Sequence, residues 1–116
     1  MVASGIIGCD IIINMSYPLK VIVLDEVETF RKNLSEQDKS KVNASITAIR
    51  SRKHGTVYIK PLKGTLRELI IKRFRFVFFV DKDIVYFVGA FIKKTKKTPI
   101  IEIENAEKIY KIITKI

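Results

Sequence analysis

Three apolar runs separated by two short polar turns constrain the fold of this chain more than any other feature. The runs cover residues 66–71, 74–80 and 84–92, and they are rich in the branched and aromatic side chains that favour β-strands. Lys72-Arg73 and Asp81-Lys82-Asp83 lie between them. Strands with such short connections pair antiparallel, because a parallel crossover needs a dozen or more residues. The sequence therefore predicts an antiparallel meander.

A strand and two short helices are predicted before the meander. Residues 19–24 form a branched, apolar run that is typical of a strand. Asp25 is a suitable N-cap for the first helix and Ser35 for the second, and Gly55 is well placed to end the second helix. Each helix has one apolar stripe at helical spacing, formed by Val27, Phe30 and Leu34 in the first and by Val42, Ile46 and Ile49 in the second.

A third helix is predicted after the meander, with Thr98 as its cap and Pro99 at its first position. Residues 60–64 are predicted to form a loop. The element order is then β-α-α-β-β-β-α, an α+β fold in which helices pack on one face of a mainly antiparallel sheet. The length of 116 residues fits a single domain, which we assign to residues 17–116, with residues 1–16 as an N-terminal extension.

The net charge of +10 is concentrated in one part of the chain. Residues 50–97 contain 14 basic and 3 acidic side chains, whereas the segments on either side are close to neutral. A localised positive field attracts a polyanion. Membrane-surface helices carry their basic residues opposite an apolar face, but here these residues lie on predicted strands and loops. Nucleic acid is therefore favoured over a membrane, and a solvated basic surface without a ligand is the alternative.

Several kinds of site are excluded by the residues that the chain lacks. Its single cysteine, Cys9, cannot form an internal disulfide, and a Cys/His zinc site needs three or four ligands. The longest uncharged stretches reach about half of the ~20 residues of a membrane-spanning helix. We expect no metal, no cofactor and a cytoplasmic location. The single histidine, His54, suits acid–base chemistry, but its place before Gly55 is typical of a residue that caps a helix.

Alternation along the strand at residues 74–80 places Arg75 on the face opposite its phenylalanines at even positions. Whether Arg67 or Glu68 of the preceding strand shares that face is left open. The last strand leads into four lysines within five residues, whose mutual repulsion an anion would relieve. We predict a concave basic surface lined by Arg75, Lys93 and Lys94, with Lys60, Lys63, Arg67, Arg73, Lys96 and Lys97 as further RNA-binding residues. Tyr58, Tyr86 and Phe91 are available for base stacking, although each could equally belong to the core.

Four segments resemble HigB-type toxins of the RelE/ParE superfamily, the toxin halves of toxin–antitoxin pairs. They are FIKKTKKTP at 91–99, LDEVETF at 24–30, KPLKGTLREL at 60–69 and RFRFVFFV at 73–80. The resemblance extends from about residue 17 to the C-terminus. It implies a small antiparallel sheet with two N-terminal helices and one C-terminal helix. It also implies an mRNA endonuclease that acts on ribosomes without a metal and inhibits translation. The expected partner is a helix-turn-helix antitoxin of the HigA type, through which alone operator DNA would be bound.

The resemblance also assigns candidate catalytic residues. The strand arginine of the family falls on Arg75, the basic pair after the last strand on Lys93 and Lys94, and the acidic residue of the E-L-R signature on Glu68. The arginine of that signature is Ile70 here. Attack of a 2′-OH on phosphorus needs a base, an acid and a group that stabilises the charged phosphorane, and a guanidinium suits the last role.

Three questions stay open at this point. Either a lysine crowded by other cations or Glu68 could be the base, and Glu68 could instead pair with a neighbouring arginine. A ParE-like toxin that binds gyrase without cutting RNA has the same fold. A nucleic-acid-binding module without toxicity would carry the same charge.

Overall fold

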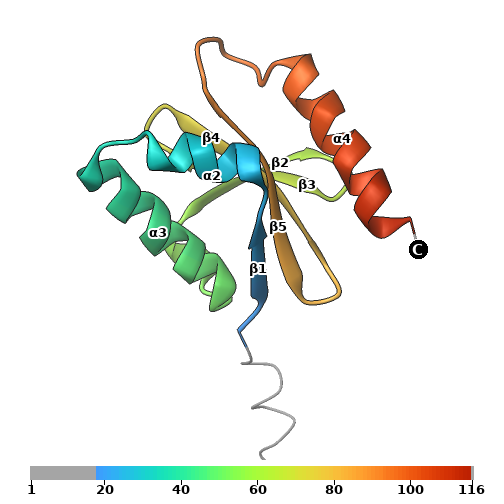
Figure 1. Cartoon of the computed structure of the whole chain (residues 1–116), viewed down its shortest axis with the longest axis horizontal. Helices are drawn as coiled ribbons and strands as arrows, with labels where there is room; N and C mark the ends of the chain where they lie inside the picture. Colours follow the sequence, from blue (N-terminus) through green and yellow to red (C-terminus); the bar gives the residue numbers. More distant parts are fainter. Residues whose placement is uncertain (1–17, 116) are drawn as a thin grey trace, which may run out of the picture.

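The computed structural model describes residues 18–115 (Figure 1). The extension predicted at residues 1–16 lies outside the described residues. The elements follow one another as β1 (Lys20–Val23), α2 (Asp25–Lys32), α3 (Glu36–Arg50), the 3₁₀ turn η1 (His54–Thr56), β2 (Tyr58–Lys63), β3 (Leu66–Ile71), β4 (Phe74–Asp81), β5 (Ile84–Ile92) and α4 (Ile100–Thr114).

The five strands form one mixed sheet in the order β1-β5-β4-β3-β2. Strands β2 to β5 are antiparallel neighbours, which confirms the predicted meander and the α+β class. Strand β1 lies parallel to β5 at one edge, so the sheet is not wholly antiparallel. This parallel pairing is possible because two helices and three strands separate β1 from β5 along the chain.

The loop predicted at residues 60–64 is wrong, because most of this segment belongs to β2. β2 is the edge strand beside β3, and its pairing is irregular between Pro61 and Lys63. A proline has no N–H to donate and is therefore confined to edge strands and bulges. Pro61 is therefore compatible with a strand here, because β2 lies at the edge of the sheet.

Helices cover both faces of the sheet, so the prediction that they pack on one face is wrong. α2 and α3 bury their apolar stripes against one side of β3 and β4, where Leu69 and Phe76 are fully buried. α4 packs on the other side against Val77 and Phe79, which are also fully buried. In Figure 1, α4 stands apart from α2 and α3. The reason is that β4 has apolar side chains on both faces, and each face needs a cover.

Two predicted helix boundaries are also wrong. Asp25 is the first residue of α2 and Leu24 is the N-cap, because the Leu24 amide still donates to the Phe87 carbonyl of β5 at 3.1 Å. Gly55 does not end α3, which stops at Arg50. The cap at Ser35 is confirmed, since its hydroxyl accepts a hydrogen bond from the Asp38 amide at 3.1 Å.

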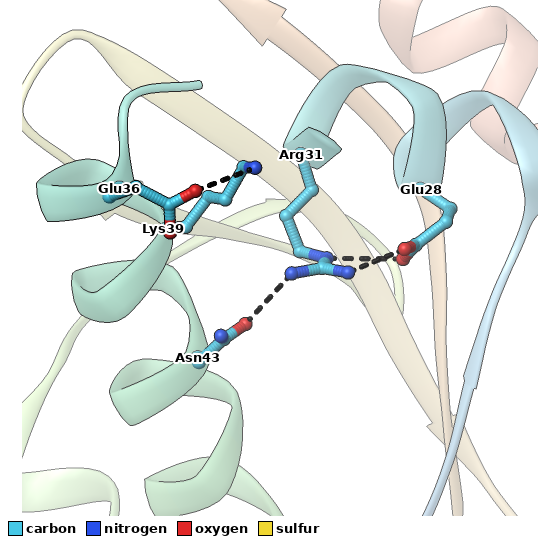
Figure 2. A network of polar contacts seen from close by, with 5 residues as sticks. All are labelled: Glu28, Arg31, Glu36, Lys39 and Asn43. Carbon is cyan, nitrogen blue, oxygen red and sulfur yellow. Dashed lines mark hydrogen bonds and ion pairs between the residues drawn. The ribbon is translucent and has the colours of Figure 1, made fainter. Parts of the chain in front are cut away.

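A polar network fixes α2 against α3 (Figure 2). The Arg31 guanidinium donates through Nε and Nη2 to the Glu28 carboxylate, and through Nη1 to Asn43 Oδ1 at 3.3 Å. The hydrogen bond from Arg31 lowers the pKa of the Glu28 carboxyl below its usual value of 4.5. Within this network, the Arg31–Asn43 hydrogen bond is the contact that links the two helices. None of the helices in residues 18–115 has the length and apolar character that crossing a membrane requires.

Candidate nucleic-acid interface

The strand register decides which residues share a face with Arg75. Arg75 pairs with Ile70 of β3, and paired residues point to the same side of a sheet. Glu68 is two residues from Ile70 and therefore lies on the same side, which is the side covered by α4. Its Oε1 lies 3.9 Å from Arg75 Nε. Arg67 points to the opposite side, so Glu68 is the β3 neighbour of Arg75 on what we call the α4 face.

The Arg75 guanidinium is held in one orientation by the turn between β3 and β4. Its Nη1 donates to the carbonyl oxygens of Lys72 at 2.7 Å and Phe74 at 3.0 Å. The side chain is 13% exposed, and its buried Nε has no hydrogen bond within residues 18–115. Nη2 carries two further N–H groups, and these are the donors to which a phosphate oxygen would bind if the contacts of Nη1 are kept.

The Glu68 carboxylate is fully buried. Its Oε2 accepts a hydrogen bond from the Thr98 hydroxyl at 2.7 Å, and its Oε1 has no hydrogen-bond partner in the described chain. A buried carboxylate oxygen without a hydrogen bond is costly, and here the nearby Arg75 charge offsets part of that cost. Glu68 therefore connects the sheet to the segment that contains Thr98.

That segment, residues 93–99, is the lysine loop, which joins β5 to α4. It is anchored at both ends, because the Lys93 amide donates to the Arg73 carbonyl at 2.8 Å and the Thr98 hydroxyl binds Glu68. Lys93 is half-buried, whereas Lys94, Lys96 and Lys97 are exposed. The loop is thus fixed over the end of the sheet at which Arg75 lies.

The cap predicted at Thr98 is wrong. Pro99 occupies the N-cap position, not the first helical position, and α4 begins at Ile100. The Thr98 hydroxyl is used by Glu68, on a strand 30 residues earlier in the sequence. A contact over that separation depends on tertiary packing, which the local pattern does not reveal.

Of the other predicted basic residues, Lys60 and Lys63 share the α4 face, whereas Arg67 lies on the opposite face. Lys60 is exposed and pairs with Glu68 across β2 and β3, so it shares the α4 face. Arg73 lies in the exposed turn beside the lysine loop. Lys63 binds Glu107 of α4 at 3.1 Å, at the other end of β2. Arg67 lines a separate hollow of about 330 Å³ on the opposite face.

Only one of the three candidate stacking residues is exposed. The Tyr58 side chain is 80% exposed, whereas Phe91 is buried and Tyr86 stacks on Phe79 with ring centroids 5.1 Å apart. Tyr58 lies at the start of the edge strand β2.

Sequence reasoning did not identify the role of Lys72. Its carbonyl orients Arg75, and its Nζ binds the Asp38 carboxylate of α3 at 2.7 Å. The hydrogen bond from Lys72 lowers the pKa of the Asp38 carboxyl below its usual value of 3.8. Lys72 has a positive φ of 53°, which is uncommon for a residue with a side chain. The signal in the sequence was the two-residue connection Lys72-Arg73, because such short hairpin turns usually need a positive φ and neither residue here is a glycine.

Among residues 18–115, the α4 face has no arrangement typical of a metal site. Within residues 18–115, no three His, Cys, Asp or Glu side chains come together in a way that could hold an ion. The groups in contact there are the Arg75 guanidinium, the buried Glu68 carboxylate and the Thr98 hydroxyl, and the exposed lysines of the lysine loop lie on the segment that Thr98 anchors. A guanidinium with ammonium groups nearby is the kind of set that can bind an anionic ligand.

The sequence matches the family described as Phage derived protein Gp49-like (DUF891) over residues 24–111, which is most of the chain. The chain belongs to this family. No curated protein sequence matches it significantly. The matched part of this Gp49-like protein includes α2, α3, the meander, the lysine loop and most of α4.

The fold is also similar to a solved structure. A chain from the crystal structure of the toxin–antitoxin complex RelBE2 of Mycobacterium tuberculosis superposes with a TM-score of 0.54. The two sequences are 16% identical, and the alignment covers 66% of the Gp49-like chain and 99% of the other. At this identity the similarity shows the fold.

Proposed function

We propose that this Gp49-like protein is the toxin of a type II toxin–antitoxin system, of the HigB type, and that it inhibits translation by cutting mRNA on the ribosome. The family match and the similarity to a chain of the RelBE2 complex support a toxin. The observation that carries the nuclease activity is the oriented Arg75 guanidinium beneath the anchored lysine loop. A cytoplasmic location follows from this function.

In the proposed reaction, the 2′-OH attacks the adjacent phosphorus and the 5′-oxygen leaves. Arg75 binds a non-bridging oxygen through Nη2 and stabilises the charged phosphorane, and Lys93 and Lys94 add positive charge beside it. We assign Glu68 to positioning, not to proton transfer, because its carboxylate has no exposed surface and already binds Thr98. The reaction needs no metal.

Proton transfer is the weak step of this arrangement. The groups described on the α4 face are mainly lysine and arginine cations. Such side chains are poor general bases or acids at neutral pH, because their ordinary pKa values lie far above it. We therefore expect slow cleavage of free RNA and much faster cleavage on the ribosome, which positions the message. Cleavage of bare RNA at the ribosomal rate would contradict this.

The test is growth arrest after induction of Arg75 variants. Arg75→Ala leaves the buried Glu68 carboxylate without its charged neighbour, so Arg75→Lys is tested beside it, because lysine keeps the charge and loses the planar fork. Both variants should lose arrest, and Arg75→Lys should keep the far-UV circular dichroism of the native protein. Arg50→Ala, at an exposed position of α3, is the matched control and should arrest growth fully.

Full toxicity of a folded Arg75→Lys variant would refute this assignment of the site. Growth arrest with DNA damage and intact transcripts would favour a ParE-like gyrase poison instead. Harmless expression of the native protein would favour a nucleic-acid-binding module.

We further propose a helix-turn-helix antitoxin of the HigA type as the partner. The exposed cations of the lysine loop and of Lys60 are complementary to an acidic segment of such a protein. Co-expression with the antitoxin should restore growth, and the complex should form in a salt-dependent manner.

A further inference from the structure

Tyr58 is the most exposed of the large hydrophobic side chains in residues 18–115, at 80%. The edge position of β2 alone does not require an aromatic residue there, since a polar side chain would protect the edge better. Neither core packing nor protection of the sheet edge therefore accounts for an aromatic residue at position 58.

Tyr58 stands in one transverse row with Arg75. Tyr58 pairs with Ile70, Ile70 with Arg75, and Arg75 with Phe91, so these four side chains share the α4 face. Neighbouring strands lie about 4.8 Å apart, which places the backbones of Tyr58 and Arg75 roughly 10 Å from each other. Lys60 follows two residues after Tyr58 on the same face and is exposed.

This juxtaposition combines two kinds of group that bind single-stranded nucleic acid. A guanidinium and ammonium groups hold the phosphates, and an exposed ring offers a flat surface to a base. The ring and the guanidinium are two β-strand spacings apart, so one extended single strand of RNA can contact both. An acidic protein segment would use the cations but would have no base to place on the ring.

We propose that Tyr58 stacks on a nucleobase of the single-stranded RNA whose phosphate is bound by Arg75. The proposal rests on the function proposed above and adds a base-binding position to it. Stacking of this kind accepts any base, because every base has a flat π-face. Tyr58 would therefore fix the register of the RNA on the α4 face without selecting its sequence.

A single fluorescent residue tests the contact directly. The chain contains no tryptophan, so the Tyr58→Trp variant has one indole as its probe. The ligand is a short 2′-O-methyl oligoribonucleotide, which this mechanism cannot cleave, and the control ligand is the same backbone without bases. The oligonucleotide should quench the indole, and the abasic backbone should bind with little quenching. Equal quenching by both ligands would overturn the proposal.

Affinities of the full chain for the same ligands provide the second measurement. Tyr58→Ala should weaken binding of the oligonucleotide about 5- to 150-fold, the range found when a stacking ring is removed. Tyr58→Phe should keep the affinity. Ile112→Ala removes a side chain of similar exposure on α4 and should have no effect. Binding of the abasic backbone should be the same for Tyr58→Ala and the native protein.

The outcomes separate this proposal from the function on which it rests. Native affinity in Tyr58→Ala, with binding lost in Arg75→Lys, would refute the stacking and leave the proposed nuclease intact. Weakened binding in Tyr58→Ala, when the native protein cuts no RNA even on ribosomes, would support the stacking and refute the nuclease. If Tyr58→Ala lost only the antitoxin, the ring would belong to a protein interface and the proposal would be overturned.

Discussion

At the scale of single residues, the geometry of the α4 face depends on the contacts of the Glu68 carboxylate. It is fully buried, lies 3.9 Å from Arg75 Nε and accepts a hydrogen bond from Thr98 at 2.7 Å. The Glu68 side chain therefore connects β4, which carries Arg75, to the lysine loop. Loss of either contact should loosen the site.

The Thr98→Val variant tests this connection. Valine has nearly the shape of threonine but cannot donate to Glu68, so a buried carboxylate oxygen loses its partner. We expect the free energy of unfolding in urea to fall by about 1–3 kcal/mol. Thr29→Val, at an exposed position of α2, should change it by less than about 0.5 kcal/mol. Equal stability of the two variants would show that the Glu68–Thr98 hydrogen bond does not hold the loop.

The sequence predicted that Arg75 lies on the face of its strand opposite Phe74, Phe76 and Phe78. It left open whether Arg67 or Glu68 of the preceding strand shares that face. Alternation within one strand gives relative orientations only. The register between strands relates the alternation of one to that of the next, and it depends on the turn at Lys72-Arg73. The partner of Glu68 was not predictable either, because Thr98 lies 30 residues away in the sequence and the contact depends on tertiary packing.

At the scale of elements, one carboxylate from α2 and one from α4 line the same hollow beside β5. Glu26 and Glu102 line a hollow of about 320 Å³ beside Val88 and Gly89. Burial raises the pKa of the Glu102 carboxyl above its usual value of 4.5, and the charge of Glu26 raises it further. Because the folded state holds this proton more tightly than the unfolded state, it loses stability as the pH rises and Glu102 ionises.

The Glu102→Gln variant should therefore melt at a higher temperature than the native protein near neutral pH. The difference should vanish below about pH 4, where both states of the native protein carry a protonated Glu102. Glu104→Gln removes an equal charge from an exposed position of α4 and serves as the control. A Glu102→Gln variant that is less stable at pH 7 than at pH 4, relative to the native protein, would contradict this account of the contact.

Most elements were predictable from local patterns. The exceptions, β2 and the placement of α4, both depend on where an element lies in the assembled sheet. The strands β3, β4 and β5 have clear apolar runs with short turns, and α2 and α3 have clear stripes. β2 was predicted as a loop because Pro61 and two lysines resemble a turn, although an edge strand accepts them. The placement of α4 on the second face follows from the double-sided burial of β4, and the apolar side chains at both odd and even positions of residues 76–80 were a signal for it that the prediction of helices on one face did not use.

At the scale of the whole molecule, the positive charge of residues 50–97 is divided between two faces. The lysine loop, Arg73, Arg75 and Lys60 lie at one end of the α4 face, whereas Arg67 lies on the opposite side and Lys63 is paired with Glu107. The charge excess in the sequence predicted a polyanion as the ligand. The fold limits the proposed contact to the end of the sheet where Arg75 and the lysine loop meet.

The most direct test of the central claim, that the α4 face at Arg75 cuts RNA, is to map the 5′ ends of transcripts after brief induction. The native protein and the Arg50→Ala variant should produce new 5′ ends within translated regions. The folded Arg75→Lys variant should produce none. New 5′ ends that persist in Arg75→Lys, or intact transcripts in arrested cells that express the native protein, would contradict the account.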